Sequence, residues 1–245
     1  EEAITKVIAG VAKKSRVISE PERKLTAYHE AGHAVCAHVL DHVSPVHQVT
    51  IVPRGRAGGF TMQLPVEDKF YATKNEMKEN LIVLLGGRVA EELTLDDIST
   101  GASNDLERVA STARQMVTKY GMSNKLGPMA FGDSEEEVFL GNSIGNKRNY
   151  SEEVASEIDQ EIRSIVDTAY KKTRTLLNDN MDRLEYVAQA LLIYETLDAE
   201  QFIKAFNKEL DLTPKQETAA TETEEVIEVK ESQTEDTIYD NKDNE

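Results

Sequence analysis

The chain combines long stretches of helical periodicity with one short region of strand periodicity. From Pro21 to about Leu40, apolar residues recur every three to four positions, which predicts a helix with Ser19 as a possible N-cap. The period changes at residues 46–52 and 60–64, where apolar and polar side chains alternate and β-branched residues are common. These two stretches predict short strands joined by a glycine-rich turn.

Most of the remaining chain has helical periodicity. We expect helices over residues 75–93, 105–120, 151–177 and 183–194, and a short one opening at Asp198 with a capping box. Ser103 or Asn104 would cap the second of these. Irregular structure with a short strand at 138–140 is expected between residues 128 and 150, and the end of another helix over residues 1–8. The fold class is therefore mainly α, with a small β-hairpin or sheet directly after the helix that begins near Pro21.

The net charge and the length of the apolar runs exclude some classes of function. The net charge of −17 argues against nucleic acid as a partner, because phosphate binding needs a basic surface. Residues 216–245 hold eleven acidic residues against two lysines, and we expect a disordered, solvating tail there. No run of eighteen apolar residues occurs, so no segment is expected to span a bilayer. The chain begins at Glu1 without a signal peptide, which suggests a fragment of a longer protein.

The predicted helix near Pro21 carries the sequence His29-Glu30-Ala31-Gly32-His33. Two histidines four residues apart share one helical face, so their nitrogens can bind one zinc ion. The neighbouring Glu30 can reach a water molecule beside that ion and act as general base. This pattern is typical of zinc peptidases. Gln in place of Glu30 should keep the metal and lose turnover.

A zinc site of this type needs a third protein ligand, and the spacing leaves it open. The metzincin continuation fails because Val39 stands six positions beyond His33. Asp105, in or beside the first turn of a helix after a glycine-containing loop, and the pair Glu91 and Glu92 are the strongest candidates. The further candidates are Asp96 and Asp97. The other histidines, His38, His42 and His47, are interpreted as surface or strand residues.

Several blocks of the sequence, in order, resemble the FtsH family of membrane-anchored, ATP-dependent zinc metalloproteases. The blocks are Tyr28–Ala34, Val49–Gly55, Gly86–Glu92, Ser99–Leu106 and Tyr120–Ser123 with Leu126–Pro128. The resemblance covers about residues 1–207. It implies that His29, His33 and Asp105 bind one Zn²⁺ per chain, that Glu30 is catalytic, and that Glu91 and Glu92 are structural.

The resemblance also implies an organisation for the whole protein. Residues 1–20 would end a preceding ATPase module and its linker, residues 21–212 would form the peptidase domain, and residues 213–245 the acidic tail. No phosphate-binding loop occurs in this chain, so ATP would act only through the absent ATPase module. The implied assembly is a homohexamer that degrades unfolded or membrane proteins. The whole protein would sit at the cytoplasmic face of the cell membrane, anchored by absent N-terminal segments, and this fragment would be soluble.

An extended substrate would lie along the segment from Gly59 to Leu64, by strand addition, in the implied peptidase. Two other classes of protein remain as alternatives. One is an inactive relative that serves as a ring-forming scaffold, although such relatives usually lose the Glu or a His of the motif. The other is a helical binding module with an accidental motif. Zinc content together with cleavage of an unfolded protein separates the three.

Overall fold

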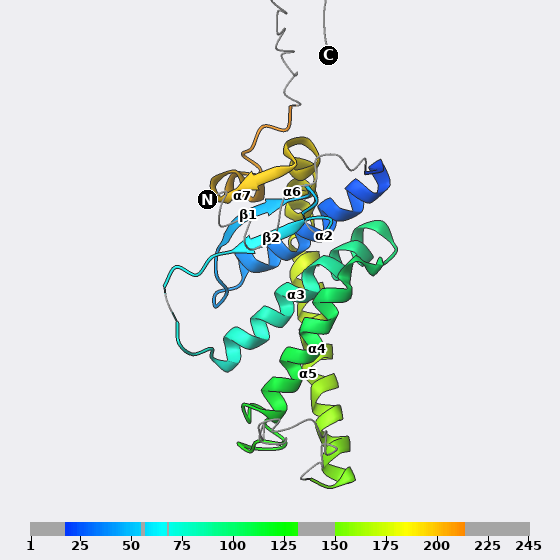
Figure 1. Ribbon diagram of the computed structural model, residues 1–245. Coiled ribbons are helices and arrows are strands. Elements are labelled where there is room, and N and C mark those ends of the chain that lie inside the picture. Colours follow the sequence, from blue (N-terminus) through cyan, green and yellow to red (C-terminus); the bar gives the residue numbers. More distant parts are fainter. Residues whose placement is uncertain (1–17, 55–56, 68, 132–149, 214–245) are drawn as a thin grey trace, which may run out of the picture. The chain divides into compact units, whose positions relative to one another are not determined.

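Six α-helices and three short strands form the part of the chain that the computed structural model describes, residues 18–54, 57–67, 69–131 and 150–213 (Figure 1). The mainly α class expected from the sequence is confirmed. The elements run α2 (Glu20–Val39), β1 (Val46–Thr50), β2 (Phe60–Gln63), α3 (Lys74–Leu95), the 3₁₀ turn η1 (Thr100–Ala102), α4 (Ser103–Thr118), α5 (Glu152–Asp179), α6 (Met181–Tyr194), β3 (Thr196–Asp198) and α7 (Ala199–Phe206).

Helix α2 is the central element of the fold. Its start follows the sequence, since Ser19 Oγ accepts a hydrogen bond from the backbone N of Glu22 at 3.4 Å and Pro21 lies in the first turn. Every residue from Ala27 to Ala37 is buried. A helix buried all round must be covered on several sides, and α2 packs mainly against α3 and α6. His29 and His33 therefore lie inside the molecule.

The β-sheet has the strand order β2-β1-β3, with β1 antiparallel to both neighbours. Val49 of β1 is opposite Thr61 on one side and Leu197 on the other. The hairpin of β1 and β2 was expected, whereas β3 was not, because the sequence indicated only the helix that Asp198 caps. In this three-stranded sheet β2 is an edge strand, so one of its sides carries no partner strand among the described residues.

Helix α4 begins two residues earlier than expected, and the predicted cap at Ser103 or Asn104 is wrong. Ala102 occupies the N-cap position and makes no side-chain hydrogen bond. The chain enters α4 from η1, where Ser99 Oγ accepts a hydrogen bond from the backbone N of Gly101. The turn before the helix is thus capped instead, and Asp105 lies within the first turn of α4.

The remaining helices agree closely with the sequence pattern. Ser151 caps α5 and Asp198 caps α7 with the expected capping box. The predicted helix end at 1–8, the strand at 138–140 and the tail beyond residue 213 lie outside the described residues. Contacts divide the chain into two units, 1–212 and 213–245. Among the described helices, none is both long and apolar enough to cross a bilayer.

Candidate metal centre

His29 and His33 project from one face of α2 toward a common point. Their Nε2 atoms are 3.0 Å apart, and the two rings meet edge to face with centroids 4.7 Å apart. The residues are only 9% and 8% exposed, respectively. Two imidazole nitrogens therefore face a point that solvent reaches only narrowly.

The opposite nitrogen of each ring is held by an acceptor on α3. His29 Nδ1 lies 2.6 Å from Glu91 Oε1, and His33 Nδ1 lies 2.7 Å from the backbone carbonyl oxygen of Val83. Because both partners accept hydrogen bonds, each Nδ1 carries and donates the proton in the neutral ring. Each Nε2 then presents a lone pair, which is the arrangement that metal-binding histidines use.

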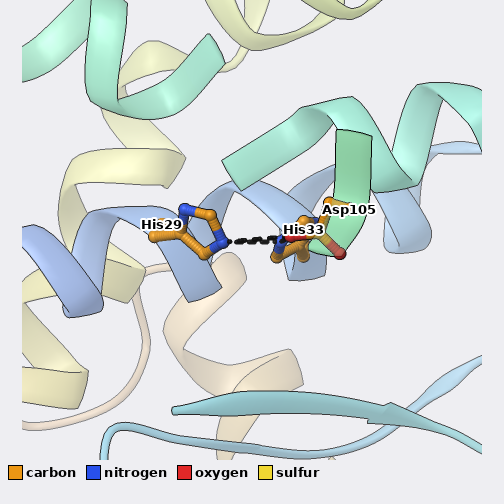
Figure 2. Close-up of side chains that lie close together, drawn as sticks. All are labelled: His29, His33 and Asp105. Atoms are coloured by element: carbon orange, nitrogen blue, oxygen red, sulfur yellow. Dashed lines mark hydrogen bonds and ion pairs between the residues drawn. The ribbon is translucent and has the colours of Figure 1, made fainter. Parts of the chain in front are cut away.

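Asp105 brings a carboxylate to the same point from the first turn of α4. Its Oδ2 lies 3.4 Å from Nε2 of both His29 and His33, and Figure 2 shows the three side chains converging from two helices. Three electron-rich atoms this close repel one another unless a proton or a cation lies among them. Two neutral imidazoles and one carboxylate are a ligand set that zinc prefers.

The spacing of these three atoms also fits zinc. A triangle with edges of 3.0, 3.4 and 3.4 Å has a common point about 2 Å from each corner, which is the usual distance from zinc to nitrogen or oxygen. The backbone of α3 leaves room for this arrangement only because residue 87 is glycine. A Cβ on Gly87 would lie 2.6 Å from Nε2 of both histidines. Donor chemistry and geometry therefore agree with a bound zinc ion.

His29, His33 and Asp105 form a cluster, and its protonation in the metal-free chain follows from the same contacts. Burial by itself lowers the pKa of His29, but hydrogen bonding to Asp105 and Glu91 outweighs burial and raises that pKa to about 10. Burial raises the pKa of Asp105, yet the two imidazoles hold it well below its usual range. The metal-free cluster therefore keeps a proton at neutral pH, and an entering cation must displace that proton.

Glu30 lies beside the cluster without belonging to it. The residue is 5% exposed, and its Oε2 accepts a hydrogen bond from Thr61 Oγ1 at 2.8 Å. Burial raises the pKa of its carboxyl group, against the opposing effect of His33 and His29. The three converging ligand atoms come from other residues. A buried carboxylate next to a metal site but outside its ligand set has the position that a general base needs.

Glu91 and Glu92, which the spacing alone left open as ligands, have other partners. Glu91 is fully buried, with Oε1 on His29 Nδ1 and Oε2 accepting a hydrogen bond from the backbone N of Ser99 at 2.7 Å. Glu91 therefore does not face the point where the three ligand atoms converge. It contacts His29, whose imidazole ring it orients.

Glu92 points away from the cluster toward α5. Its carboxylate accepts hydrogen bonds from the Tyr170 hydroxyl and the Arg174 guanidinium. These bonds join α3 to α5 and leave Glu92 with no contact to either imidazole. Asp96 and Asp97, the further candidates, are exposed beyond the end of α3.

The other three histidines lie away from the cluster. His38 is exposed and packs against the rings of Phe202 and Phe206, while His42 pairs with Glu79 at the surface. His47 belongs to β1. Their interpretation as surface and strand residues therefore agrees with the structure.

Thr61 and Gly87 were missed by the sequence reasoning. The alternating pattern indicated a strand around Thr61 but gave no reason to pair it with Glu30, thirty-one positions away. Gly87 is one half of a Gly-Gly pair inside a helix, a pattern that is typical of close packing. That signal could not identify the imidazoles as the groups packed against it.

Comparison with known proteins identifies the family that this chain matches. The family model for peptidase family M41 matches residues 16–205. The chain is 69% identical over 210 residues to ATP-dependent zinc metalloprotease FtsH 2 of Alkaliphilus metalliredigens, covering 86% of this chain and 30% of the relative. It is 54% identical over 202 residues to ATP-dependent zinc metalloprotease FtsH of Bacillus subtilis, covering 82% and 32%.

The chain thus spans about a third of the length of the curated relatives that it matches. The match to the family model includes α2 with its two histidines, the sheet, and the first turn of α4 with Asp105. It extends over well more than half of the 245 residues. This chain belongs to peptidase family M41.

Proposed function

We propose that this chain is a zinc-dependent endopeptidase module that hydrolyses peptide bonds of unfolded or membrane-derived proteins. The observation that carries the proposal is the convergence of His29 Nε2, His33 Nε2 and Asp105 Oδ2 on one point with the carboxylate of Glu30 beside it. The relatives' names, ATP-dependent zinc metalloprotease, support both the ion and the reaction.

The residues divide the work as follows. His29, His33 and Asp105 would hold zinc, which when bound lowers the pKa of a water molecule and polarises the scissile carbonyl group. Glu30 accepts a proton from the attacking water and delivers it to the leaving amine nitrogen. Glu91 keeps the proton of His29 on Nδ1 and so keeps Nε2 free to bind.

The edge of β2 offers a place for an extended substrate. A peptide can add as a further strand to an edge that lacks a partner, using main-chain hydrogen bonds that tolerate many side chains. In this sheet β2 is such an edge strand, and it lies against Glu30 through Thr61. Binding by the main chain suits a peptidase that accepts many unfolded sequences, and it excludes chains that are still folded.

Substrate delivery and assembly would belong to the whole protein. We place this module after an ATPase module, in a homohexamer anchored to the cell membrane, with residues 1–20 as the junction, residues 21–212 as the peptidase domain and residues 213–245 as an appended acidic segment. The words ATP-dependent in the names of the relatives, together with their greater length, support the ATPase module. The homohexamer and the membrane anchor are what the resemblance to the FtsH family implies. Without the ATPase, this module should cleave loose chains and leave stable folded proteins intact.

Metal analysis and casein cleavage on one set of variants test the function. We expect the unaltered chain to hold one zinc and to cleave casein, and His29→Ala and Asp105→Asn to lose most of both. Glu30→Gln should keep zinc and lose at least about 100-fold in rate, since general-base catalysis contributes at least that much. Glu107→Gln, an exposed acid of α4, is the matched control and should change neither.

The outcomes separate the proposed function from its alternatives. Stoichiometric zinc without cleavage by the unaltered chain would indicate a ring-forming scaffold. Absence of zinc from a correctly folded chain would indicate a binding module. Loss of zinc from Glu30→Gln, or full activity of Asp105→Asn, would contradict the assigned roles of these residues.

A further inference from the structure

The hydroxyl of Thr61 joins the edge strand of the sheet to the carboxylate of Glu30. Thr61 Oγ1 lies 2.8 Å from Glu30 Oε2 and 3.2 Å from the backbone carbonyl oxygen of the same residue. A hydroxyl carries one proton, and the contact to Oε2 is the shorter of the two, so Oε2 is the main acceptor of this hydrogen bond. Within the described ranges, no other side chain donates a hydrogen bond to this carboxylate.

We propose that Thr61 is a positioning residue for Glu30 in peptide hydrolysis, holding Oε2 and leaving Oε1 as the atom that receives the proton. The proposal rests on the function proposed above. It assigns Thr61 no contact with substrate or metal. Thr61 acts only through the orientation of the general base.

The surroundings of Glu30 explain why one hydrogen bond matters. A Cβ on Gly59 would lie 2.9 Å from Glu30 Cγ, so the backbone before β2 packs directly against the middle of this side chain. Packing limits where Cγ lies but does not set the rotation of the terminal carboxylate, which is a broad torsion. The hydroxyl of Thr61 fixes that rotation. If the carboxylate of Glu30 is wrongly oriented, the rate of hydrolysis falls while substrate binding is unchanged.

The location of Thr61 on β2 also links the docking of a peptide to the orientation of Glu30. The main chain of β2 would receive the substrate strand, while the side chain of Thr61 on the same strand bonds to Glu30. Substrate that adds to β2 restrains the strand and therefore restrains the donor of this hydrogen bond. Docking of a peptide and orientation of the base thus act through one structural element.

The test uses zinc-loaded 245-residue chain and two substitutions at one position. Thr61→Val keeps the β-branched shape and removes the hydroxyl, whereas Thr61→Ser keeps the hydroxyl and removes a methyl group. We expect Thr61→Val to lower kcat about tenfold or more, with KM within about twofold and zinc content unchanged, because only the alignment of the base is lost. Thr61→Ser should restore kcat to within about threefold of the original value.

Thr50→Val is the matched control. Thr50 lies in the adjacent strand β1, and its hydroxyl bonds to Thr196 Oγ1 and the carbonyl oxygen of Glu195, away from Glu30. This variant should lower the unfolding midpoint while leaving kcat close to its original value. A fall in kcat equal to that of Thr61→Val would mean that sheet stability alone explains both, and would overturn the proposal.

A second measurement examines the hydrogen bond without any turnover. Thermal unfolding of Thr61→Val, Glu30→Ala and the double variant, all metal-free, should give non-additive shifts of the midpoint, because each single change breaks the same bond. Additive shifts, unchanged kcat in Thr61→Val, or failure of Thr61→Ser to restore activity would each overturn the positioning role. An inactive unaltered chain would instead refute the proposed function itself.

Discussion

Gly32 of α2 and Gly86 of α3 meet backbone to backbone. A Cβ on Gly32 would lie 2.4 Å from the carbonyl oxygen of Gly86, and a Cβ on Gly86 would lie 2.7 Å from the carbonyl oxygen of Gly32. No side chain fits between the two helices at this level. The contact sits next to the imidazole of His33, whose Nδ1 reaches the Val83 carbonyl on α3. Close packing of α2 on α3 therefore lies directly beside the candidate metal centre.

The first prediction concerns this contact. Gly32→Ala should destabilise the metal-free chain by about 3 kcal/mol, because the added methyl forces α2 and α3 apart. Gly58→Ala, whose Cβ would meet nothing closer than Thr26 Oγ1 at 3.5 Å, should change stability by less than about 0.5 kcal/mol. Urea unfolding in the presence of a chelator measures both, and equal stabilities would contradict the backbone contact.

The second prediction concerns Gly87. A methyl group at this position would lie 2.6 Å from the Nε2 atoms of His29 and His33, within the space where the ligand atoms converge. We expect Gly87→Ala to bind far less than one zinc per chain while keeping its helical circular dichroism. Metal analysis after dialysis is the measurement, and a full zinc content would show that the imidazoles can shift aside.

The third prediction separates two adjacent carboxylates. Glu91→Gln should lower zinc affinity about 10- to 100-fold, because the buried carboxylate that orients the His29 ring is replaced by a neutral amide. Glu92→Gln should leave zinc affinity unchanged and cost less than about 1 kcal/mol, since its partners lie on the partly exposed face toward α5. Competition with a chromophoric chelator compares the two, and equal affinities would refute the role of Glu91.

The fourth prediction concerns pH in the metal-free chain. The folded-state pKa of His29, about 10, lies above the ordinary value of 6.5, so its protonated form stabilises the fold. This contribution is complete below about pH 6.5 and is lost as the pH rises through about 10. The unfolding midpoint should therefore fall over that window more steeply than in His29→Gln. Parallel curves for the two proteins would contradict the raised pKa.

Zinc uptake follows from the same protonation. Because the entering ion displaces the proton of the His29 cluster, apparent zinc affinity should rise with pH and protons should be released on binding near neutral pH. Calorimetry in buffers of different ionisation enthalpy counts these protons, and uptake with no release would show that the free cluster is unprotonated.

How well the sequence predicted a feature of the structure depends on how many positions separate the interacting residues along the chain. Helix α2 and its two histidines follow from local rules, since a cap and a four-residue spacing decide them within twenty residues. Asp105 remained one alternative among several until the resemblance to a family was used, because a ligand seventy-two positions beyond His33 depends on how α4 packs. Local periodicity carries no information on that packing.

The short strand β3 shows the same limit. Its three residues, Thr196–Asp198, make too short a pattern to indicate a strand, and they pair with β1 about 150 positions earlier. The bond between Thr61 and Glu30 is similar, since it requires β2 to lie across α2. Both features are tertiary, and neither has a signature within its own segment.

Helix α2 is also held by residues that lie much later in the chain. Arg23 donates a hydrogen bond to the carbonyl oxygen of Leu192, and the hydroxyl of Tyr28 bonds to Glu185, both more than 150 positions later in the chain. During synthesis from the N-terminus, the side of α2 that packs on α6 therefore stays exposed until α6 has been made, even after α3 covers the other side. The packing around α2 is therefore completed only after most of the domain has been translated.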